Sequence, residues 1–290
     1  CYPKHQTVAI ISVMRPSIIV PLSGLGSRFP KSEYHVCKPL ILIDNRSIIE
    51  WSMSCIDYEG CNLIFIVRSE HIAEYAIDSF LKQKFQGAQI VVVPELTRGA
   101  AETCLAAKHL VDLDSPLFIH CSDVWWEPTI RLKDFQCLYD GCILTFKSSS
   151  SNYSYSKINE DGLVSEVAEK KVISNNASVG LYHFNRAEDF FNAAQSSVDS
   201  YSGTEIHVCP VYGKLIADGK SIVTRNVDSF HVFGTPEEYK FFVNNSLKSF
   251  PANKKTVAIC SDHSGFKSKE IFKFLAAKFN LECIDFGTYD

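Results

Sequence analysis

The chain has 290 residues, of which 46% are hydrophobic and 21% are charged, and this composition excludes a disordered or fibrous protein. The formal net charge is −4 and there is no block of basic residues, so the sequence lacks the charge pattern of a nucleic-acid-binding protein. The longest apolar runs, such as residues 18–22, fall far short of the roughly 20 residues that cross a bilayer. We therefore expect neither a nucleic-acid partner nor a membrane span.

The eleven cysteines are scattered along the chain without a secretory signal or a close CxxC pair. This spacing favours reduced thiols over a disulfide framework, and it predicts a cytoplasmic protein. His120 with Cys121, and His207 with Cys209, are residue types that bind zinc. Neither pair has the spacing of zinc ligands, so buried thiols are the simpler interpretation.

The two ends of the chain differ from its main part. Residues 1–16 precede the first recognisable strand and contain the first methionine, Met14. Two interpretations stay open for them: an extension upstream of the natural start, or an extra strand, because residues 8–13 are β-prone. Residues 248–255 combine Pro, Asn and charged residues and predict a linker. We expect residues 256–290 to be a truncated second domain.

Short β-branched runs alternate with amphipathic stretches in the first half of the main domain, which we place at residues 17–247. The predicted strands are residues 17–22, 40–43, 62–67, 89–93 and 117–121. The predicted helices are residues 47–57, 71–85 and 100–113. This alternation predicts an α/β fold with a mostly parallel sheet that is covered on both faces.

The pattern changes between residues 142 and 184, where several short strands are separated by turn signals at 160–162 and 174–176. We expect a small antiparallel subdomain beside the parallel sheet, and it is the natural place for an acceptor pocket. The elements predicted after it are helices at 186–194 and 205–218, a strand at 221–226 and a helix from Pro236.

A glycine-rich segment, SGLGSRF at residues 23–29, follows the first strand. Glycines in this position let backbone N–H groups approach phosphate oxygens, and Arg28 and Lys38 supply matching positive charge. The segment therefore has the chemistry of a triphosphate cradle. A GxGxR motif alone also fits an ordinary tight turn between a strand and a helix.

The segments IIVPLSGLGSRF, KPLILID and IIEW resemble, in this order, the N-terminal signature of the sugar-1-phosphate nucleotidyltransferases. Further motifs follow in the order of that family, and the resemblance covers about residues 17–245. They are TRGAAET at 97–103, SD at 122–123, AEK at 168–170, SVGLY at 178–182, Glu205 with PVY at 210–212, and GTPE at 234–237. Within the family, the chain is most similar to enzymes of bacterial capsule-polysaccharide loci.

The resemblance implies a Rossmann-like nucleotide-diphospho-sugar transferase fold with a small antiparallel acceptor subdomain. It also implies a reaction that joins a nucleoside triphosphate to a sugar phosphate or related phosphorylated acceptor, with Mg²⁺ as cofactor and pyrophosphate as product. The products would be precursors of capsule or surface polysaccharide. The base, the sugar and the oligomeric state do not follow from it, and a homo-oligomer is compatible with the sequence.

The resemblance also implies roles for individual residues. Arg28 would hold the departing pyrophosphate, Lys38 would neutralise charge near the α-phosphate, and Asp123 would bind Mg²⁺. The implied nucleotide-binding residues are Leu22, Gly24, Gly26, Ser27 and Gly99. The implied acceptor-binding residues are Lys157, Glu169, Lys170, Gly180 and Glu205. Asp123 also follows the apolar strand at 117–121, at the sheet edge where open α/β sheets bind ligands.

Each of these charged residues has a plainer interpretation. Arg28 or Lys38 could belong to a surface ion pair, Asp123 could cap a helix, and Glu169 and Lys170 could lie on a solvated strand end.

One position departs from the family pattern. Many members carry a second metal-binding Asp two residues before the Gly of GTPE, and Val232 occupies that place here. Either Asp123 holds Mg²⁺ with phosphates and water, or Asp228 substitutes from the preceding turn. The same gap leaves open a non-catalytic nucleotide-binding module.

The C-terminal segment carries SDHSGF at 261–266 and DFGT at 285–288, which resemble the opening of type B ribose-5-phosphate isomerases. The resemblance implies that Asp262 and His263 meet a sugar phosphate. No cysteine here occupies the catalytic motif of that family, so we expect no isomerase activity from this segment. A sugar-phosphate isomerase whose N-terminal domain binds a nucleotide is the alternative for a longer chain.

Overall fold

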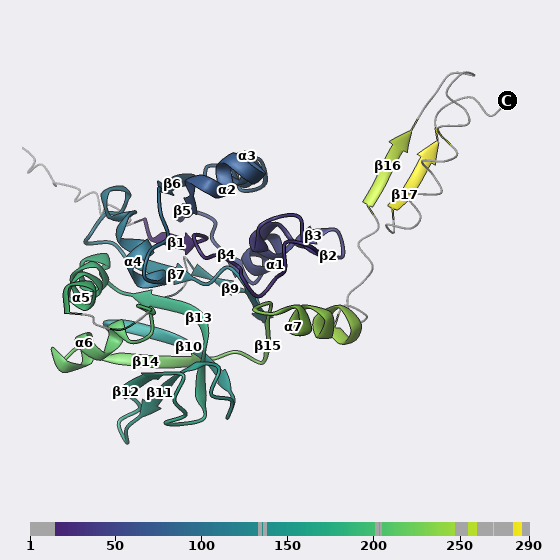
Figure 1. The fold of residues 1–290 in the computed structure, drawn as a ribbon. Coiled ribbons are helices and arrows are strands. Elements are labelled where there is room, and N and C mark those ends of the chain that lie inside the picture. Colours follow the sequence, from purple (N-terminus) through teal and green to yellow (C-terminus); the bar gives the residue numbers. More distant parts are fainter. Residues whose placement is uncertain are drawn as a thin grey trace, which may run out of the picture.

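The structure is a computed structural model that describes residues 15–132, 135, 138–200, 203 and 205–246, together with 255–259, 269 and 281–285 (Figure 1). Several expectations lie outside the described residues. They concern Met14 and the strand at 8–13, most of the linker at 248–255, and Asp262 and His263.

Parallel strands form the half of the central sheet that holds the N-terminal motifs. These strands are β1 (Ser17–Pro21), β5 (Asn62–Arg68), β6 (Gln89–Val93) and β7 (Leu117–His120). They lie in the order β7-β1-β5-β6. Along β1, Ile18 and Val20 belong to one hydrophobic core and Ile19 to another. The sheet therefore buries apolar side chains on both faces, as parallel sheets require.

The antiparallel strands extend the same sheet. Their bounds are β10 (Gly141–Lys147), β11 (Ser154–Ile158), β12 (Val164–Glu169) and β13 (Asn176–Phe184), and they are joined by β14 (Ile222–Asn226). β13 is buried throughout and pairs antiparallel with both β7 and β10, while β14 pairs in parallel with β10. Within the described residues the sheet has nine strands. The predicted α/β class with a largely parallel central sheet is confirmed.

Helices cover the two faces of this sheet. α1 (Ile48–Ser54) and α3 (Ile77–Lys84) contribute side chains to the core that contains Ile18. The core that contains Ile19 includes side chains of α4 (Ala100–Leu105), α5 (Ala187–Ser200) and α6 (Val211–Ala217). A capping box at Ser47 and Glu50 begins α1, and it satisfies backbone N–H groups that the first turn leaves free.

Smaller elements complete the chain. They are η1 (Lys38–Leu40), β2 (Leu42–Ile43), β3 (Arg46–Ser47), β4 (Ile56–Asp57), α2 (Ser69–Tyr75), η2 (Lys108–Leu110), β8 (Val124–Glu127), β9 (Ile130–Arg131), β15 (Ser229–Val232), α7 (Pro236–Phe241), the π-helix η4 (Phe242–Ser246), β16 (Lys255–Ile259) and β17 (Leu281–Asp285). β16 and β17 pair in parallel with each other.

The helix predicted at residues 71–85 is wrong as a single element. Ala76 adopts a left-handed conformation with φ of 50°, and its N–H donates to Ile72 O, which closes α2. The chain then changes direction into α3, where Ile77 and Leu81 are fully buried. Tertiary burial of these two side chains accompanies a backbone conformation that Ala rarely adopts.

The helix predicted at residues 205–218 is also too long. Residues 205–207 lie across the segment that follows β6, because Ile206 N donates to Arg98 O and Ala101 N donates to Ile206 O. α6 begins only after Pro210. The long-range backbone hydrogen bonds of Ile206 take the place of those within a helix.

Four further boundaries differ from the prediction. The helix expected at 186–194 continues to Ser200. The strand expected at 40–43 starts as η1, with Pro39 in its first turn, where the missing N–H of proline costs nothing. The helix expected at 100–113 ends at Leu105 and is followed by η2. The helix expected at 47–57 ends at Ser54, because Ile56 and Asp57 pair with β9.

None of the described helices combines the length and the apolarity that a bilayer span needs. Cys37, Cys55, Cys104, Cys121 and Cys209 are free thiols.

Candidate functional site

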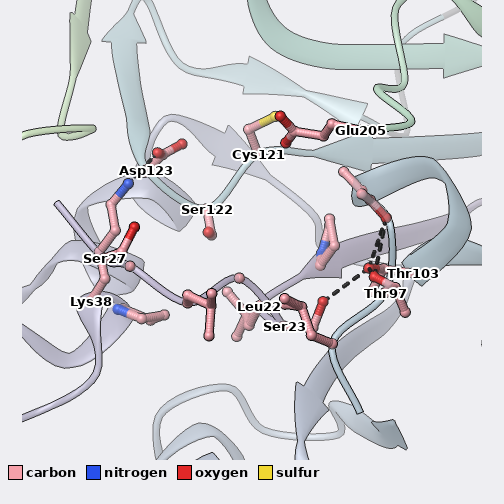
Figure 2. A pocket seen from close by; sticks show the side chains of 18 of the residues that line it. Leu22, Ser23, Ser27, Lys38, Thr97, Thr103, Cys121, Ser122, Asp123 and Glu205 are labelled. Carbon is pink, nitrogen blue, oxygen red and sulfur yellow. Dashed lines mark hydrogen bonds and ion pairs between the residues drawn. The ribbon is translucent and has the colours of Figure 1, made fainter. Parts of the chain in front are cut away.

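A cavity of about 530 Å³ opens at the carboxyl ends of β1, β6 and β7 (Figure 2). This is the edge at which open α/β sheets bind their ligands. The segments that line it follow these three strands, and they are joined by residues from η1, from the chain before α6 and from the turn before α7. The lining residues are 21–28, Lys38, Pro39, 96–100, Thr103, 121–123, Glu205 and Gly234.

The glycine loop forms one wall of this cavity. Gly26 has a φ of 62°, and a Cβ there would lie 3.0 Å from Lys38 Cβ, so the turn against Lys38 requires glycine. Next to Gly24, no described atom lies within 4 Å of the place that a Cβ would take. The backbone at Gly24 therefore faces open space, which suits the close approach of a phosphate oxygen. Leu22 and Ser27 also line the cavity.

A chain of hydroxyl groups connects the glycine loop to the segment after β6 (Figure 2). Ser23 Oγ lies 2.9 Å from Thr103 Oγ1, and Thr103 Oγ1 lies 2.5 Å from Thr97 Oγ1. Both threonine hydroxyls also lie within hydrogen-bond distance of Gly99 O, so one of them donates to this carbonyl while the other donates to its neighbour. Sequence reasoning assigned no role to these three hydroxyls, although the TRGAAET motif contains two of them.

Gly99 lies where two segments touch. Its φ is 152°, and a Cβ would lie 2.5 Å from Ile206 O and 2.6 Å from Ile206 N. This contact carries residues 205–207 over the cavity and so brings Glu205 into its lining. The glycine at this position is thus explained by packing as well as by the expected contact with a nucleotide.

Lys38 and Asp123 form an ion pair inside the cavity, with Lys38 Nζ 2.5 Å from Asp123 Oδ2 (Figure 2). Their side chains are 18% and 30% exposed. Burial by itself raises the pKa of Asp123, but the positive charges of Lys38 and Arg28 outweigh it and hold this pKa below its ordinary value. Asp123 is therefore a carboxylate near neutral pH, and Lys38 neutralises it.

Arg28 and Cys121 complete this part of the cavity. Arg28 is exposed, and its Nη1 lies 3.4 Å from the place of a Cβ on Gly234. The guanidinium thus lies at the rim of the cavity, beside the GTPE motif. Burial raises the pKa of the Cys121 thiol to about 12, so Cys121 stays protonated and is a poor nucleophile.

The donors at Asp123 fit Mg²⁺, which usually binds one or two carboxylates together with substrate phosphates and water. Among the described residues, no group of three or more His, Cys, Asp or Glu side chains could hold a metal ion. Val232 lies opposite Val124 in the β8–β15 ladder and packs on the hydrophobic core. The structure thus places one carboxylate, Asp123, beside the glycine loop.

Asp228 does not reach this place. Phe233 N donates to Asp123 O at one end of the β8–β15 ladder, and Asp228 N donates to Glu127 O at the other end. Four residue steps lead from Asp123 to Glu127, and at about 3.3 Å per step they separate the two ends of the ladder by roughly 13 Å along the backbone. Asp228 lines a different cavity, together with Arg46 and Trp125. The substitution of Asp228 for the second metal ligand is therefore contradicted by the geometry.

The expected acceptor residues fall into two sets. Glu169 and Lys170 lie at the end of β12, and Lys170 Nζ is 3.8 Å from Glu205 Oε2. Gly180, with φ of 90°, packs against Cys121, whose N donates to Gly180 O. Of these four residues, Glu205 belongs to the described lining of the cavity, and the other three lie behind that lining, in contact with Glu205 or Cys121 or close to them.

Lys157 is the exception, because it is exposed on β11, opposite Glu166, and no described contact joins it to Glu205 or to another residue of the cavity lining. The sequence singles out His207 only as a zinc-binding residue type and does not place it with the acceptor residues, although its Nε2 lies 3.3 Å from Glu205 Oε2 and 3.7 Å from Glu169 Oε1. A histidine two residues after Glu205 was the available signal.

Comparison with known proteins identifies relatives of this fold and site. Residues 19–229 match the nucleotidyl transferase family. A nucleoside-diphosphate-sugar pyrophosphorylase from Vibrio cholerae RC9 has a similar structure, with a TM-score of 0.70, 27% sequence identity, and coverage of 79% of this chain and 100% of that one. The inositol-1-phosphate CTP transferase from T. maritima has a TM-score of 0.63 at 15% identity, covers 82% of this chain and 98% of its own, and shows a likeness of fold alone.

No curated protein matches the chain. Because the family match spans most of the chain and includes the glycine loop, Lys38, Asp123 and Glu205, the chain belongs to the nucleotidyl transferase family.

Proposed function

We propose that this protein transfers a nucleotidyl group from a nucleoside triphosphate to a sugar phosphate or related phosphorylated acceptor. The observation that carries the proposal is the cavity at the carboxyl edge of the parallel sheet, where Arg28, Lys38 and Asp123 surround an open glycine backbone. The name of the structural relative at 27% identity, a nucleoside-diphosphate-sugar pyrophosphorylase, supports this class of reaction.

In this reaction an oxygen of the acceptor phosphate attacks the α-phosphorus of the nucleotide. A new P–O–P bond forms, the bond from the α-phosphorus to the bridging oxygen breaks, and the electron pair leaves with pyrophosphate. No protein nucleophile is needed, so the contribution of the chain is positioning and charge neutralisation. The glycine loop provides backbone N–H groups, and Lys38 and Arg28 provide cations that match the growing charge on the phosphates.

Asp123 is the residue that would hold Mg²⁺, and the ion would supply Lewis-acid stabilisation of phosphate charge. Lys38 neutralises Asp123 in the free protein, and it would be free to contact phosphate oxygens if Asp123 held the metal ion. Glu169, Lys170 and Glu205 form the acceptor side of the site. The resemblance to enzymes of capsule loci extends the proposal to precursors of capsule or surface polysaccharide.

Pyrophosphate release tests the proposal directly. Each of the common nucleoside triphosphates is incubated with Mg²⁺ and a panel of sugar phosphates, and we expect release with at least one pair. Thermal shift with the same nucleotides identifies the base, because a ligand that binds the native state raises its apparent stability. Nucleotide binding without pyrophosphate release from any pair would contradict transfer and favour a nucleotide-binding module.

Arg28→Ala is the matching variant. We expect it to lower turnover by at least about 100-fold with the fold intact, because the lost cation stabilises charge on pyrophosphate and such a contribution is commonly about 3 kcal/mol. Lys82→Ala is the control, since Lys82 is an exposed cation on α3 that is absent from the described cavity lining. Unchanged turnover in Arg28→Ala would remove Arg28 from the mechanism.

A further inference from the structure

Acidic and basic side chains meet at the junction of β12 with residues 205–207, and one of them, Glu205, lines the cavity. Two carboxylates face the same imidazole, because His207 Nε2 lies 3.3 Å from Glu205 Oε2 and 3.7 Å from Glu169 Oε1. Lys170 Nζ approaches Glu205 from another direction, at 3.8 Å. These residues come from two segments that are far apart in the sequence, and the contact of Gly99 with Ile206 is what brings them together.

Two carboxylates that share one partner repel each other unless a proton or a cation lies between them. The other oxygen of Glu169 accepts a hydrogen bond from Ser154 Oγ, so Glu169 is held from two sides. Its side chain is 21% exposed, that of His207 is 25% exposed and that of Glu205 is 53% exposed. Glu205 is thus the most exposed of the three, and it lines the cavity.

Resting on the proposed transfer reaction, we infer that His207 is a positioning residue of the acceptor subsite. Its Nε2 lies within ion-pair distance of the carboxylates of Glu205 and Glu169 and so keeps Glu205 close to the end of β12, beside the cavity. The remaining lone pairs of Glu205 accept hydrogen bonds from the hydroxyl groups of a polyhydroxylated phosphate, and Lys170 provides positive charge for its phosphate. His207 and Glu169 are both absent from the described cavity lining, so His207 acts on the acceptor through Glu205, which belongs to that lining.

The inference predicts a selective loss of acceptor affinity. Calorimetry is carried out with glucose 1-phosphate, mannose 1-phosphate and ribose 5-phosphate, in the presence of a non-hydrolysable analogue of the nucleotide that stabilises the protein most. We expect His207→Ala to weaken the binding of the acceptor with the highest affinity by at least about 10-fold, an effect of the size that follows the loss of a contact with a charged group. The affinity for the nucleotide analogue stays within 2-fold of the wild-type value.

Two further variants separate positioning from a general structural effect. His207→Gln keeps an N–H donor on the side chain, so it restores acceptor affinity to within about 3-fold of wild type. His109→Ala removes an exposed histidine on η2 and leaves both affinities unchanged. A His207→Ala protein that binds the acceptor like wild type, or that loses nucleotide affinity equally, overturns the inference.

The outcomes also distinguish this inference from the proposed function. If the wild-type protein binds a sugar phosphate, His207→Ala weakens this binding and no pyrophosphate is released, the proposed transfer is wrong and the positioning role of His207 stands. If wild-type protein binds none of the three acceptors, the inference is wrong, whatever the result with nucleotide.

Discussion

At the scale of single residues, the Lys38–Asp123 ion pair sets the charge of the cavity before any ligand binds. The two side chains are 85 positions apart in the sequence and meet at 2.5 Å. A divalent cation that binds Asp123 has to compete with the ammonium group of Lys38. Nucleotide phosphates attract this ammonium group away from Asp123, so they favour binding of the metal at the same time. The nucleotide and the metal are therefore expected to bind cooperatively.

Asp123→Asn tests the metal assignment without depending on turnover. We expect the affinity of the nucleotide-loaded protein for Mn²⁺, used as a paramagnetic probe for Mg²⁺, to fall by at least about 10-fold, or about 1.4 kcal/mol, because an amide carries no negative charge. Electron paramagnetic resonance titration measures the free and bound ion.

Asp228→Asn is the matched control for this measurement, since Asp228 is an exposed carboxylate that lines the other cavity. It is expected to leave Mn²⁺ affinity unchanged. Equal losses in the two variants would show that the effect comes from overall charge and not from ligation by Asp123.

At the scale of elements, the contact between residues 98–101 and Ile206 connects the nucleotide side of the cavity to its acceptor side. Gly99 permits this contact, since its hypothetical Cβ would overlap the Ile206 backbone. Residues 205–207 then carry Glu205 and His207 toward the end of β12. The acceptor side of the site therefore depends on a packing contact between two loops.

Gly99→Ala is expected to lower the free energy of unfolding by about 3 kcal/mol or more, because backbone strain adds to overlap with Ile206. Gly87→Ala is the control: Gly87 also has a positive φ, of 79°, but no described atom lies within 4 Å of its Cβ position. It should cost only about 1 kcal/mol from the backbone conformation. Urea unfolding measures the free energy of unfolding of both variants. Equal losses in the two variants would show that overlap with Ile206 does not contribute to the destabilisation.

At the scale of the whole molecule, buried histidines make stability depend on pH. Burial lowers the pKa of His120 and of His183 to about 4, against 6.5 for an ordinary histidine. The unfolded chain therefore binds protons more strongly than the folded chain between these values. The part of the stability that depends on neutral His120 and His183 is fully present above about pH 6.5 and is lost as the pH falls toward 4.

We expect the free energy of unfolding to fall between pH 6.5 and 4 by roughly 1.4 kcal/mol per pH unit for each of these two histidines. Urea unfolding over this range measures the slope. His183→Phe keeps an aromatic ring beside Phe118 and Phe135 and removes one titrating group. The dependence of the unfolding free energy on pH should therefore become less steep by roughly 1.4 kcal/mol per pH unit. A slope that His183→Phe leaves unchanged would contradict the assignment to His183.

The sequence by itself determined the fold class and the positions of the parallel strands. β6 has the predicted bounds, and β1, β5 and β7 differ from the prediction by a single residue. Apolar runs and their alternation with helical patterns are local signals, so they can be read without knowledge of the rest of the chain. The same holds for the order of the glycine loop, Lys38, Asp123 and Glu205 along the chain.

Only the tertiary structure decided how the distant segments meet. The break at Ala76, the extended path of residues 205–207 and the position of His207 between Glu169 and Glu205 all depend on contacts between residues far apart in sequence. Local helix propensity favoured continuous helices at 71–85 and 205–218, but core burial and backbone hydrogen bonds to Ile206 outweighed it, because propensity differences are only tenths of a kcal/mol per residue. For the same reason, the ladder that separates Asp228 from Asp123 became apparent only once β8 and β15 were paired.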